Sequence, residues 1–280
     1  MEILAGFSIS KRLAELVNNL SELEEAQLNN QSKIELYVGS YATPLSVLPL
    51  AVYADRFGLS IYYTKDSNSN YCSYLDTIGF PRGMTNSCSS EKSYLAIRKL
   101  SVVREDKTLG DYVDRIFSLI NLPGAFGLSN SLETFTSELV ANVRQHAEVK
   151  NYWVFAQYYE KARPKTCEIV IADTGIGYKK SYESHKIKAE TDTEAIQNAL
   201  EGISSKPGDG RGYGIQNVAS LSLKGFGGKL VIMTGKSIMY YKRYIKKATK
   251  EVELSYGWGG SVVCVNFTPR DLDDWISYML

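Results

Sequence analysis

The sequence predicts an α/β protein in which helices cover one face of a mixed β-sheet, preceded by a smaller α/β unit. Helix and strand patterns alternate up to about residue 105, whereas beyond it a pair of helical patterns precedes a series of strand patterns. With 280 residues, 44% of them apolar, the chain is long enough to bury a substantial core. We therefore expect two domains, 1–105 and 106–280, with the boundary near residues 104–108.

The first unit is expected to begin with a helix and then alternate strands and helices. Ser10 is the expected N-cap of the first helix, whose leucines recur at helical spacing up to Leu23. Pro49 is expected in the first turn of an apolar helix ended by Gly58, because a first-turn N–H has no helical partner. The other expected elements are strands at Ile34–Val38, Leu59–Thr64 and Tyr94–Val103 and a short helix at Tyr71–Ile78.

The second unit is expected to open with two helices and to continue mainly with strands. Apolar spacing predicts the helices at Leu109–Ile120 and Ser129–Ala147. A long polar stretch, Tyr178–Asp209, contains one helical pattern with Asp192 as its expected N-cap. The remaining expected elements are strands at Tyr152–Tyr159, Cys167–Ala172, Lys229–Met233, Ser237–Tyr244, Val252–Tyr256 and Ser261–Phe267, and helices at Ile215–Leu221 and Asp271–Leu280.

Charge and cysteine usage argue against several classes of protein. The formal net charge is +1 at pH 7, so no global attraction to nucleic acid or acidic membrane is expected. The four cysteines lack metal-ligand spacing and there are only two histidines, which argues against a structural zinc site and fits a reduced intracellular protein. No signal peptide or membrane-spanning pattern is present. We expect a cytoplasmic protein, whose oligomeric state the sequence does not indicate.

Three polar residues are expected on one face of the longer helix. Glu138, Asn142 and His146 are spaced four residues apart, so their side chains drift only about 40° around the helix axis. A carboxylate, an amide and an imidazole on one face can hold a hard cation through oxygen and polarise a water molecule. Taken alone, this spacing is more often that of a solvated helix face.

A second polar pattern directly follows the apolar strand that ends at Ala172. Asp173 stands at the strand end, and Gly175 and Gly177 follow it. A carboxylate here can accept a hydrogen bond from an exocyclic amine such as that of adenine, and the glycines let the backbone approach a ligand. A plain turn between a strand and a helix would give the same pattern.

A third pattern is a glycine-rich loop before a helix. Gly210, Gly212 and Gly214 would expose backbone N–H groups at a helix start, which suits phosphates. The loop lacks the Lys-Ser/Thr ending of a Walker A loop, and no strand immediately precedes it as in a dinucleotide fingerprint. Lys206 and Arg211 flank the glycines and either meet the β- or γ-phosphate or lie in solvent.

The order of these patterns is more specific than any one of them. A helix with E-x-x-x-N-x-x-x-H, a strand ending in D-x-G-x-G and a G-x-G-x-G loop opening a helix resemble the GHKL superfamily of histidine-kinase-like ATPases. That superfamily includes gyrase B subunits, MutL, histidine kinases and anti-sigma serine kinases. The resemblance covers about residues 108–270, including a last strand that contains Gly260-Ser261-Val262-Val263. It implies a two-layer α/β sandwich of the Bergerat type that binds ATP with Mg²⁺.

The resemblance also implies a role for each matched residue. Glu138 would be the catalytic base that activates water, Asn142 would bind Mg²⁺ through its side-chain oxygen, and His146 would lie near the phosphates. Asp173 would read the adenine amine, and Tyr178–Asp209 would form a mobile lid. The residues implied to bind ATP are Asn142, His146, Asp173, Gly175, Gly177, Lys206, Gly210, Arg211, Gly212 and Gly214.

Three functions remain open at this point. The first is a slow ATPase that acts as an ATP-gated conformational switch for a protein partner. The second is an anti-sigma-type serine/threonine kinase acting on a STAS-like partner, and the third is a nucleotide sensor without turnover. Glu138 favours catalysis over sensing alone. Neither His146 nor His185 lies on a separate dimerisation helix, so autophosphorylation on histidine is not expected.

Residues 33–80 resemble a STAS domain, a small α/β module found in anti-sigma antagonists. The resemblance rests on the strand–helix–strand order and on the segment Tyr74–Phe80. Thr43 and Ser46 stand near the point where such domains carry a phosphorylated serine, although helix capping explains either one. We expect this unit to have a structural role or to dock a protein partner.

The segment Lys236–Lys250 combines basic residues with tyrosines. Such a ribbon can bind a phosphate backbone and stack bases, but edge strands also carry lysines that prevent sheet–sheet association. Because the net charge is near zero, nucleic-acid binding is not the expected function. The residues concerned are Lys236, Tyr240, Tyr241, Lys242, Arg243, Tyr244, Lys246, Lys247 and Lys250.

Overall fold

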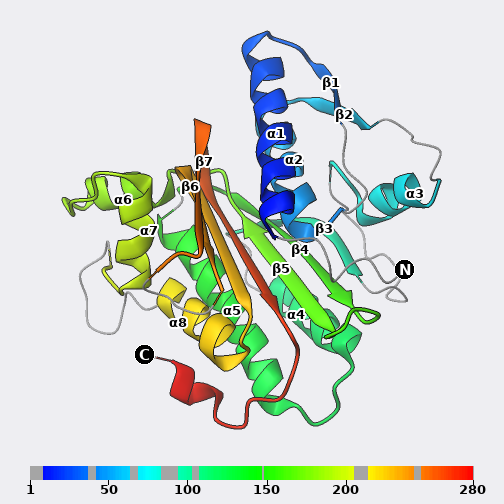
Figure 1. The fold of residues 1–280 in the computed structure, drawn as a ribbon, viewed down its shortest axis with the longest axis vertical. Helices are drawn as coiled ribbons and strands as arrows, with labels where there is room; N and C mark the ends of the chain where they lie inside the picture. The colour runs from blue at the N-terminus through cyan, green and yellow to red at the C-terminus, as the bar shows by residue number, and fades with distance from the viewer. Residues whose placement is uncertain are drawn as a thin grey trace.

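A five-stranded sheet with helices on both faces forms the centre of the computed structural model (Figure 1). The predicted α/β sandwich is confirmed. The structure describes residues 9–36, 42–63, 69–82, 94–102, 107–146, 148–204, 214–242 and 247–279.

The strands of this sheet follow the order β3-β4-β5-β7-β6. Every neighbouring pair among these described strands is antiparallel, so the expectation of a mixed sheet was wrong for the described residues. The strands are β3 Tyr94–Ser101, β4 Asn151–Tyr159, β5 Thr166–Ala172, β6 Lys229–Tyr241 and β7 Lys250–Phe267.

The last two strands form one long hairpin, although the sequence predicted four separate strands there. The β6–β7 register shifts around Gly235, where the left-handed backbone (φ 52°) favours glycine. Residues 257, 259 and 260 of β7 are also glycines, which interrupt its apolar alternation. These interruptions made each continuous strand resemble two short ones.

One face of the sheet is covered by helices of the second unit. Their apolar residues form a continuous core with β3–β7, to which α5 contributes Leu132, Phe135, Leu139 and Val143. These helices are α4 Lys107–Ile120, α5 Phe126–His146, α6 Gly177–Ser184, α7 Asp192–Leu200 and α8 Gly214–Ser220, the last continued by a π-helical turn at Leu221–Gly225.

Helices from the first unit cover the opposite face. The helices α1 (Ile9–Leu28) and α2 (Pro44–Phe57) share a hydrophobic core with sheet residues that include Trp153 and Phe155 (Figure 1). The predicted boundary near residues 104–108 follows β3, so a strand from the first unit completes the sheet of the second. No helix within the described ranges combines the length and apolarity needed to cross a bilayer.

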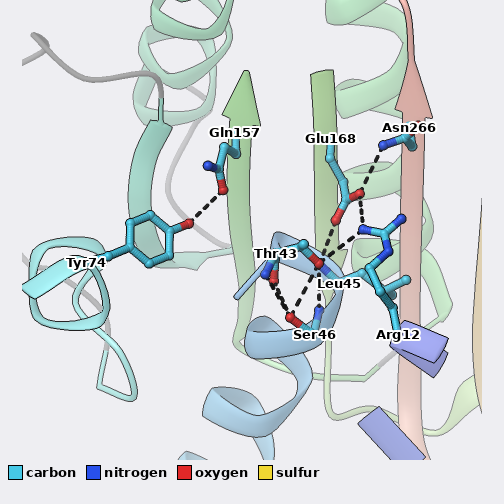
Figure 2. Close-up of polar contacts among 8 residues, drawn as sticks. All are labelled: Arg12, Thr43, Leu45, Ser46, Tyr74, Gln157, Glu168 and Asn266. Carbon is cyan, nitrogen blue, oxygen red and sulfur yellow. Dashed lines mark hydrogen bonds and ion pairs between the residues drawn. The ribbon is translucent and has the colours of Figure 1, made fainter. Parts of the chain in front are cut away.

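The rest of the first unit is a parallel strand pair and a short helix. β1 (Lys33–Leu36) pairs with β2 (Ser60–Tyr63), and α3 spans Ser69–Ile78. The hydroxyl of Tyr74 on α3 donates to Gln157 Oε1 on β4 at 2.6 Å, which fastens α3 to the sheet (Figure 2). The strand–helix–strand order agrees with the expectation, and the likeness to a STAS domain stays a prediction.

Two helix starts in the first unit differ from the expectation. Ser10 lies inside α1 and is not its N-cap. Thr43 caps α2 in a reciprocal pair with Ser46, so this helix begins at Pro44 and Pro49 falls in its interior. Thr-Pro is itself a helix-start signal, because proline suits the first helical position.

The second unit also departs from the expectation at two termini. Thr191, rather than Asp192, caps α7 by accepting a hydrogen bond from the N–H of Glu194 at 3.1 Å. The expected final helix is reduced to a 3₁₀ turn at Trp275–Tyr278.

Candidate functional site

The helix motif and the last glycine of the loop motif meet at one place. Glu138 and Asn142 lie on the partly exposed face of α5, and Gly214 is the first residue of α8. A Cβ atom on Gly214 would lie 3.1 Å from Glu138 Oε2 and 3.2 Å from Asn142 Oδ1. Gly214 therefore lies close against both polar groups, and a side chain at this position would crowd them.

The hydrogen bonds of these two side chains are incomplete. Glu138 Oε1 accepts a 3.4 Å hydrogen bond from Asn217 Nδ2, which leaves Oε2 toward Gly214. Asn142 Nδ2 is buried and has no hydrogen-bond partner among the described residues. Because buried polar atoms are nearly always hydrogen-bonded, this orphaned amide indicates a missing polar partner. A nucleotide with its metal fits these residues.

Asp173 is buried at the end of β5, where three donors contact its carboxylate. Oδ1 accepts from the N–H of Gly175 at 2.8 Å. Oδ2 accepts from the N–H and the hydroxyl of Ser261 at 3.2 and 2.6 Å. An ionised carboxylate offers about four lone-pair sites. About one acceptor position, on Oδ1, therefore remains for a ligand amine.

Opposing influences act on the ionisation of Asp173. Burial raises its pKa above the ordinary value, while the hydrogen bonds from Ser261 and Gly175 and the positive charge of Arg56 lower it. The guanidinium of Arg56 lies against Gly259, where any Cβ atom would collide with it. Helix α2 of the first unit thus reaches the strand segment that supports Asp173.

Two glycines let the loop after Asp173 lie flat on the sheet. Gly177 has φ 76°, and its Cβ would lie 2.6 Å from Thr234 Oγ1. That hydroxyl donates to the carbonyl of Gly260 at 2.8 Å. Gly260 has φ 95°, and its Cβ would collide with the carbonyl of Asp173. Both positions require glycine for conformation and for space.

The structure describes six of the eleven residues proposed for the site together with their surroundings. Helix α6 begins at Gly177 and contacts α5. The loop after Asp173 and the α5 residues Glu138 and Asn142 therefore lie on the same side of the sheet. The backbone of His146 ends α5, but its side chain lies outside the described residues. The other predicted site residues outside them are Lys206, Gly210, Arg211 and Gly212.

The segment predicted as a lid, Tyr178–Asp209, contains two helices where the sequence indicated one. The hydroxyl of Tyr182 on α6 donates to the carbonyl of Ile203 at 2.6 Å. Asp192 Oδ2 on α7 accepts from the N–H of Lys236 at 2.9 Å. These contacts hold the described residues of the segment together and against β6.

Three residues of the site were not assigned a role from the sequence. The role of Ser261 could have been suspected from the sequence, because it follows two glycines in the strand already matched to the GHKL pattern. Asn217 lies three residues after Gly214, a spacing that places both on one side of α8. Nothing in the sequence indicated a role for Thr234, since threonine is common in β-strands.

The described tyrosines of the basic segment near residues 236–250 are not exposed, as base stacking would require. Tyr240 and Tyr241 are only 4% and 1% exposed and belong to the cores on opposite faces of the sheet. Tyr244 lies outside the described residues. Packing therefore explains the positions of the two described tyrosines.

No group of three or more His, Cys, Asp or Glu side chains is placed to hold a metal ion within the described ranges. Mg²⁺ is commonly bound through few protein ligands together with substrate phosphates. Asn142, with Oδ1 close to Gly214 at the start of α8, is a described side chain that fits such a role.

Comparisons with known proteins place the chain in no family. No protein-family model matches the sequence, and no curated protein matches it. Among solved structures it is similar to the histidine kinase domain of the blue-light activated histidine kinase from Erythrobacter litoralis EL346, with 14% identity, covering 95% of this chain and 100% of that chain. The TM-score is 0.25, which is too low to support an argument from that structure.

Proposed function

We propose that this chain binds Mg²⁺·ATP between α5 and the loop Asp173–Gly177 and hydrolyses it slowly, as an ATP-gated switch for a protein partner. The observation that carries the proposal is the meeting of Glu138 and Asn142 with Gly214. Residues from two motifs 72 positions apart, Asn142 and Gly214, lie close together, and the amide of Asn142 is buried without a hydrogen-bond partner among the described residues. A polar ligand at this place would give the buried amide the hydrogen-bond partner that it lacks among the described residues.

The two residues on α5 have distinct proposed roles. Bound ATP supplies the phosphoanhydride whose terminal phosphoryl group is transferred to water. Asn142 would hold the metal through its side-chain oxygen. Glu138 orients the attacking water and takes its proton at Oε2, the oxygen beside Gly214, while Asn217 holds Oε1.

Adenine recognition is assigned to Asp173. Its carboxylate is fixed by Ser261 and Gly175, and Oδ1 retains capacity for an exocyclic amine. A buried acceptor that is held in place loses little side-chain entropy on binding. This arrangement favours a base with an amine donor over one that offers a carbonyl at the same position.

In this proposal, the first unit transmits the effect of nucleotide binding to a protein partner. Arg56 of α2 acts electrostatically on Asp173 and lies against Gly259, so a nucleotide that moves this loop also acts on α2. Coupling of this kind requires that the ligand favour one arrangement of the two units over the other. We propose that α1, α2 and their connected strands present that change to a protein.

Steady-state hydrolysis and equilibrium ATP binding, measured on Glu138→Gln, test the catalytic role of Glu138. We expect the turnover number to fall by about 10²–10⁴, the usual contribution of a general base, with the dissociation constant for ATP unchanged within about threefold. Glu133→Gln, an exposed glutamate on the same helix, is the matched control and should retain wild-type turnover.

Three other outcomes would redirect the assignment. Unchanged turnover in Glu138→Gln would remove Glu138 from the catalytic role. ATP binding by the wild type without turnover would favour the sensor. Phosphorylated serine or threonine on a candidate STAS-like protein after incubation with ATP, found by mass spectrometry, would favour the kinase.

A further inference from the structure

A cavity lies at the opposite end of β5 from the Asp173 loop. It encloses about 260 Å³ between α1, the β4–β5 turn and the ends of β6 and β7. Glu168 on its wall is five residues before Asp173, roughly 16 Å along the strand. The volume is below the about 300–1,000 Å³ of pockets for drug-sized ligands, so a small molecule or ion is the appropriate occupant.

The wall of this cavity carries more positive than negative charge. Arg12, Arg163 and Lys229 line it together with one carboxylate, that of Glu168. Glu168 is already matched, because Oε2 accepts from Arg12 at 2.8 Å and from Asn266 at 3.0 Å, and Oε1 accepts from the N–H of Leu45 at 3.0 Å (Figure 2). Two cationic charges on the wall therefore lack a counter-ion there.

Neither of the two remaining cations has an acidic partner among the residues that the structure describes. Among the described residues, the exposed Arg163 donates to the backbone carbonyls of Glu160 and Ala162 and to no side chain. Lys229 is half-buried, and burial followed by the charges of Arg12 and Lys242 lowers its pKa, against the opposing effect of Glu168. An anion in the cavity would offset both the burial and the repulsion.

An independent sign of a missing ligand is the phenol of Tyr159. This side chain lines the cavity, and its hydroxyl is buried without any hydrogen-bond partner among the described residues. A buried hydroxyl that makes no hydrogen bond costs about 1–3 kcal/mol. An acceptor bound in the cavity would satisfy it.

We propose that this cavity is a binding site for a small phosphate dianion, either inorganic phosphate or a low-molecular-weight phosphate monoester. A phosphate monoester carries about −1.5 to −2 charges at pH 7, which matches the two uncompensated cations. Its oxygens accept charge-assisted hydrogen bonds from Lys229 and Arg163 and one from the phenol of Tyr159. A monovalent carboxylate would neutralise only one of the two cations.

The position of the site gives the bound anion a structural consequence. Arg12 belongs to α1 and Thr43 caps α2, whereas the other walls come from the sheet and its turns. A ligand held in a cavity that residues of both units line stabilises the folded arrangement, because it binds the folded chain and not the unfolded one.

Calorimetric titration of the full chain with sodium phosphate, against sodium chloride at matched ionic strength, tests the proposal. We expect saturable binding in the wild type. Lys229→Met and Tyr159→Phe should each weaken phosphate binding by about tenfold. Lys165→Met, which removes an exposed lysine from the same β4–β5 turn, should bind as the wild type does.

Tyr159→Phe keeps the test valid if the lysine variant folds poorly. It deletes only an oxygen that has no partner among the described residues, so the unfolding temperature without phosphate should stay the same or rise, while the rise caused by phosphate should shrink. Phosphate should also bind at least about tenfold more tightly than acetate, and the Asp173→Asn variant should bind phosphate normally.

Absence of saturable phosphate binding would overturn the proposal, as would phosphate binding that survives both Lys229→Met and Tyr159→Phe. Equal affinity for acetate would overturn the preference for a dianion. Because Asp173→Asn addresses ATP alone, a failure of ATP binding leaves this result unaffected and the two proposals are tested separately.

Discussion

Two buried carboxylates of the same strand region, Glu168 and Asp173, differ in the direction in which the fold shifts their pKa. They stand five residues apart and are 0% and 2% exposed. The pKa of Glu168 is lowered from its usual value, and that of Asp173 is raised. Burial acts in the same direction on both, so their partners account for the difference.

The partners differ in charge. Burial alone would raise the pKa of Glu168, but the charge and hydrogen bond of Arg12, together with the hydrogen bonds from the N–H of Leu45 and from Asn266, outweigh it (Figure 2). The described donors in hydrogen-bond contact with Asp173 are all neutral, and the charge of Arg56 is the weakest of the influences on its pKa. Burial therefore prevails at Asp173.

This difference separates a structural carboxylate from a candidate functional one. Glu168 joins Arg12 of α1 and the first turn of α2 to the centre of the sheet through three hydrogen bonds, one of them from a cation. Asp173 also accepts three hydrogen bonds, but all three come from neutral groups among the described residues, and its raised pKa is typical of groups that bind or react. Burial alone does not distinguish the two roles, whereas the charge of the partner does.

The largest expected effect comes from removing the cation that matches Glu168. Arg12→Met leaves a buried carboxylate without its counter-ion and should lower the free energy of unfolding by about 3–5 kcal/mol, measured by urea denaturation. Lys99→Met is the control, because it breaks an exposed ion pair with Asp55 and should cost no more than about 1 kcal/mol. Equal costs for the two variants would contradict the structural role of Glu168.

Opposite dependences of stability on pH are expected from the two carboxylates. The folded pKa of Glu168 lies below 4.5, so its contribution is fully present above about pH 4.5 and is lost as the pH falls through the folded value. The folded pKa of Asp173 lies above 3.8, so its contribution is present below about pH 3.8 and is lost as the pH rises through the folded value.

Urea denaturation as a function of pH distinguishes these two contributions. Between about pH 3 and 5.5, Glu168→Gln should flatten the increase of stability with pH, and Asp173→Asn should make that increase steeper. Slopes that change in the same direction in both variants would contradict the comparison.

A smaller effect on stability, with a clear effect on binding, is expected from Gly214→Ala. Alanine is favoured over glycine in helices by up to about 1 kcal/mol, but its Cβ would crowd Glu138 and Asn142, so the two effects oppose each other and the unfolding free energy should change by no more than about 1 kcal/mol. The new methyl group would displace these two side chains, so ATP affinity should fall at least about fivefold in a calorimetric titration. Unchanged affinity would show that the nucleotide does not depend on the positions of these side chains.

Much of the sheet and helix layer could be predicted from the sequence, because apolar periodicity marks elements that bury one face. The strand Cys167–Ala172 and the helix carrying Leu132, Phe135, Leu139 and Val143 are of this kind. The continuity of β6 and β7 could not be predicted, because glycines break the alternation while the backbone pairing continues. Pairing between strands depends on partners that are distant in sequence.

The candidate site was only partly predictable for the same reason. The spacing of Glu138 and Asn142 along one helix is local, and the structure retains it. The contacts of Asp173 with Ser261 and of Arg12 with Glu168 join residues 88 and 156 positions apart, and no local pattern specifies them. Residues of this second kind decide which carboxylate is structural.

The most direct test of the central claim is calorimetric titration of ATP, with and without Mg²⁺, into the wild type and Asp173→Asn. We predict saturable, Mg²⁺-dependent binding by the wild type that the substitution weakens at least tenfold, which corresponds to about 1.4 kcal/mol. The unfolding curve of each protein, recorded alongside, confirms that both are folded. Absence of ATP binding by the folded wild type, or equal affinity in both proteins, would contradict the account.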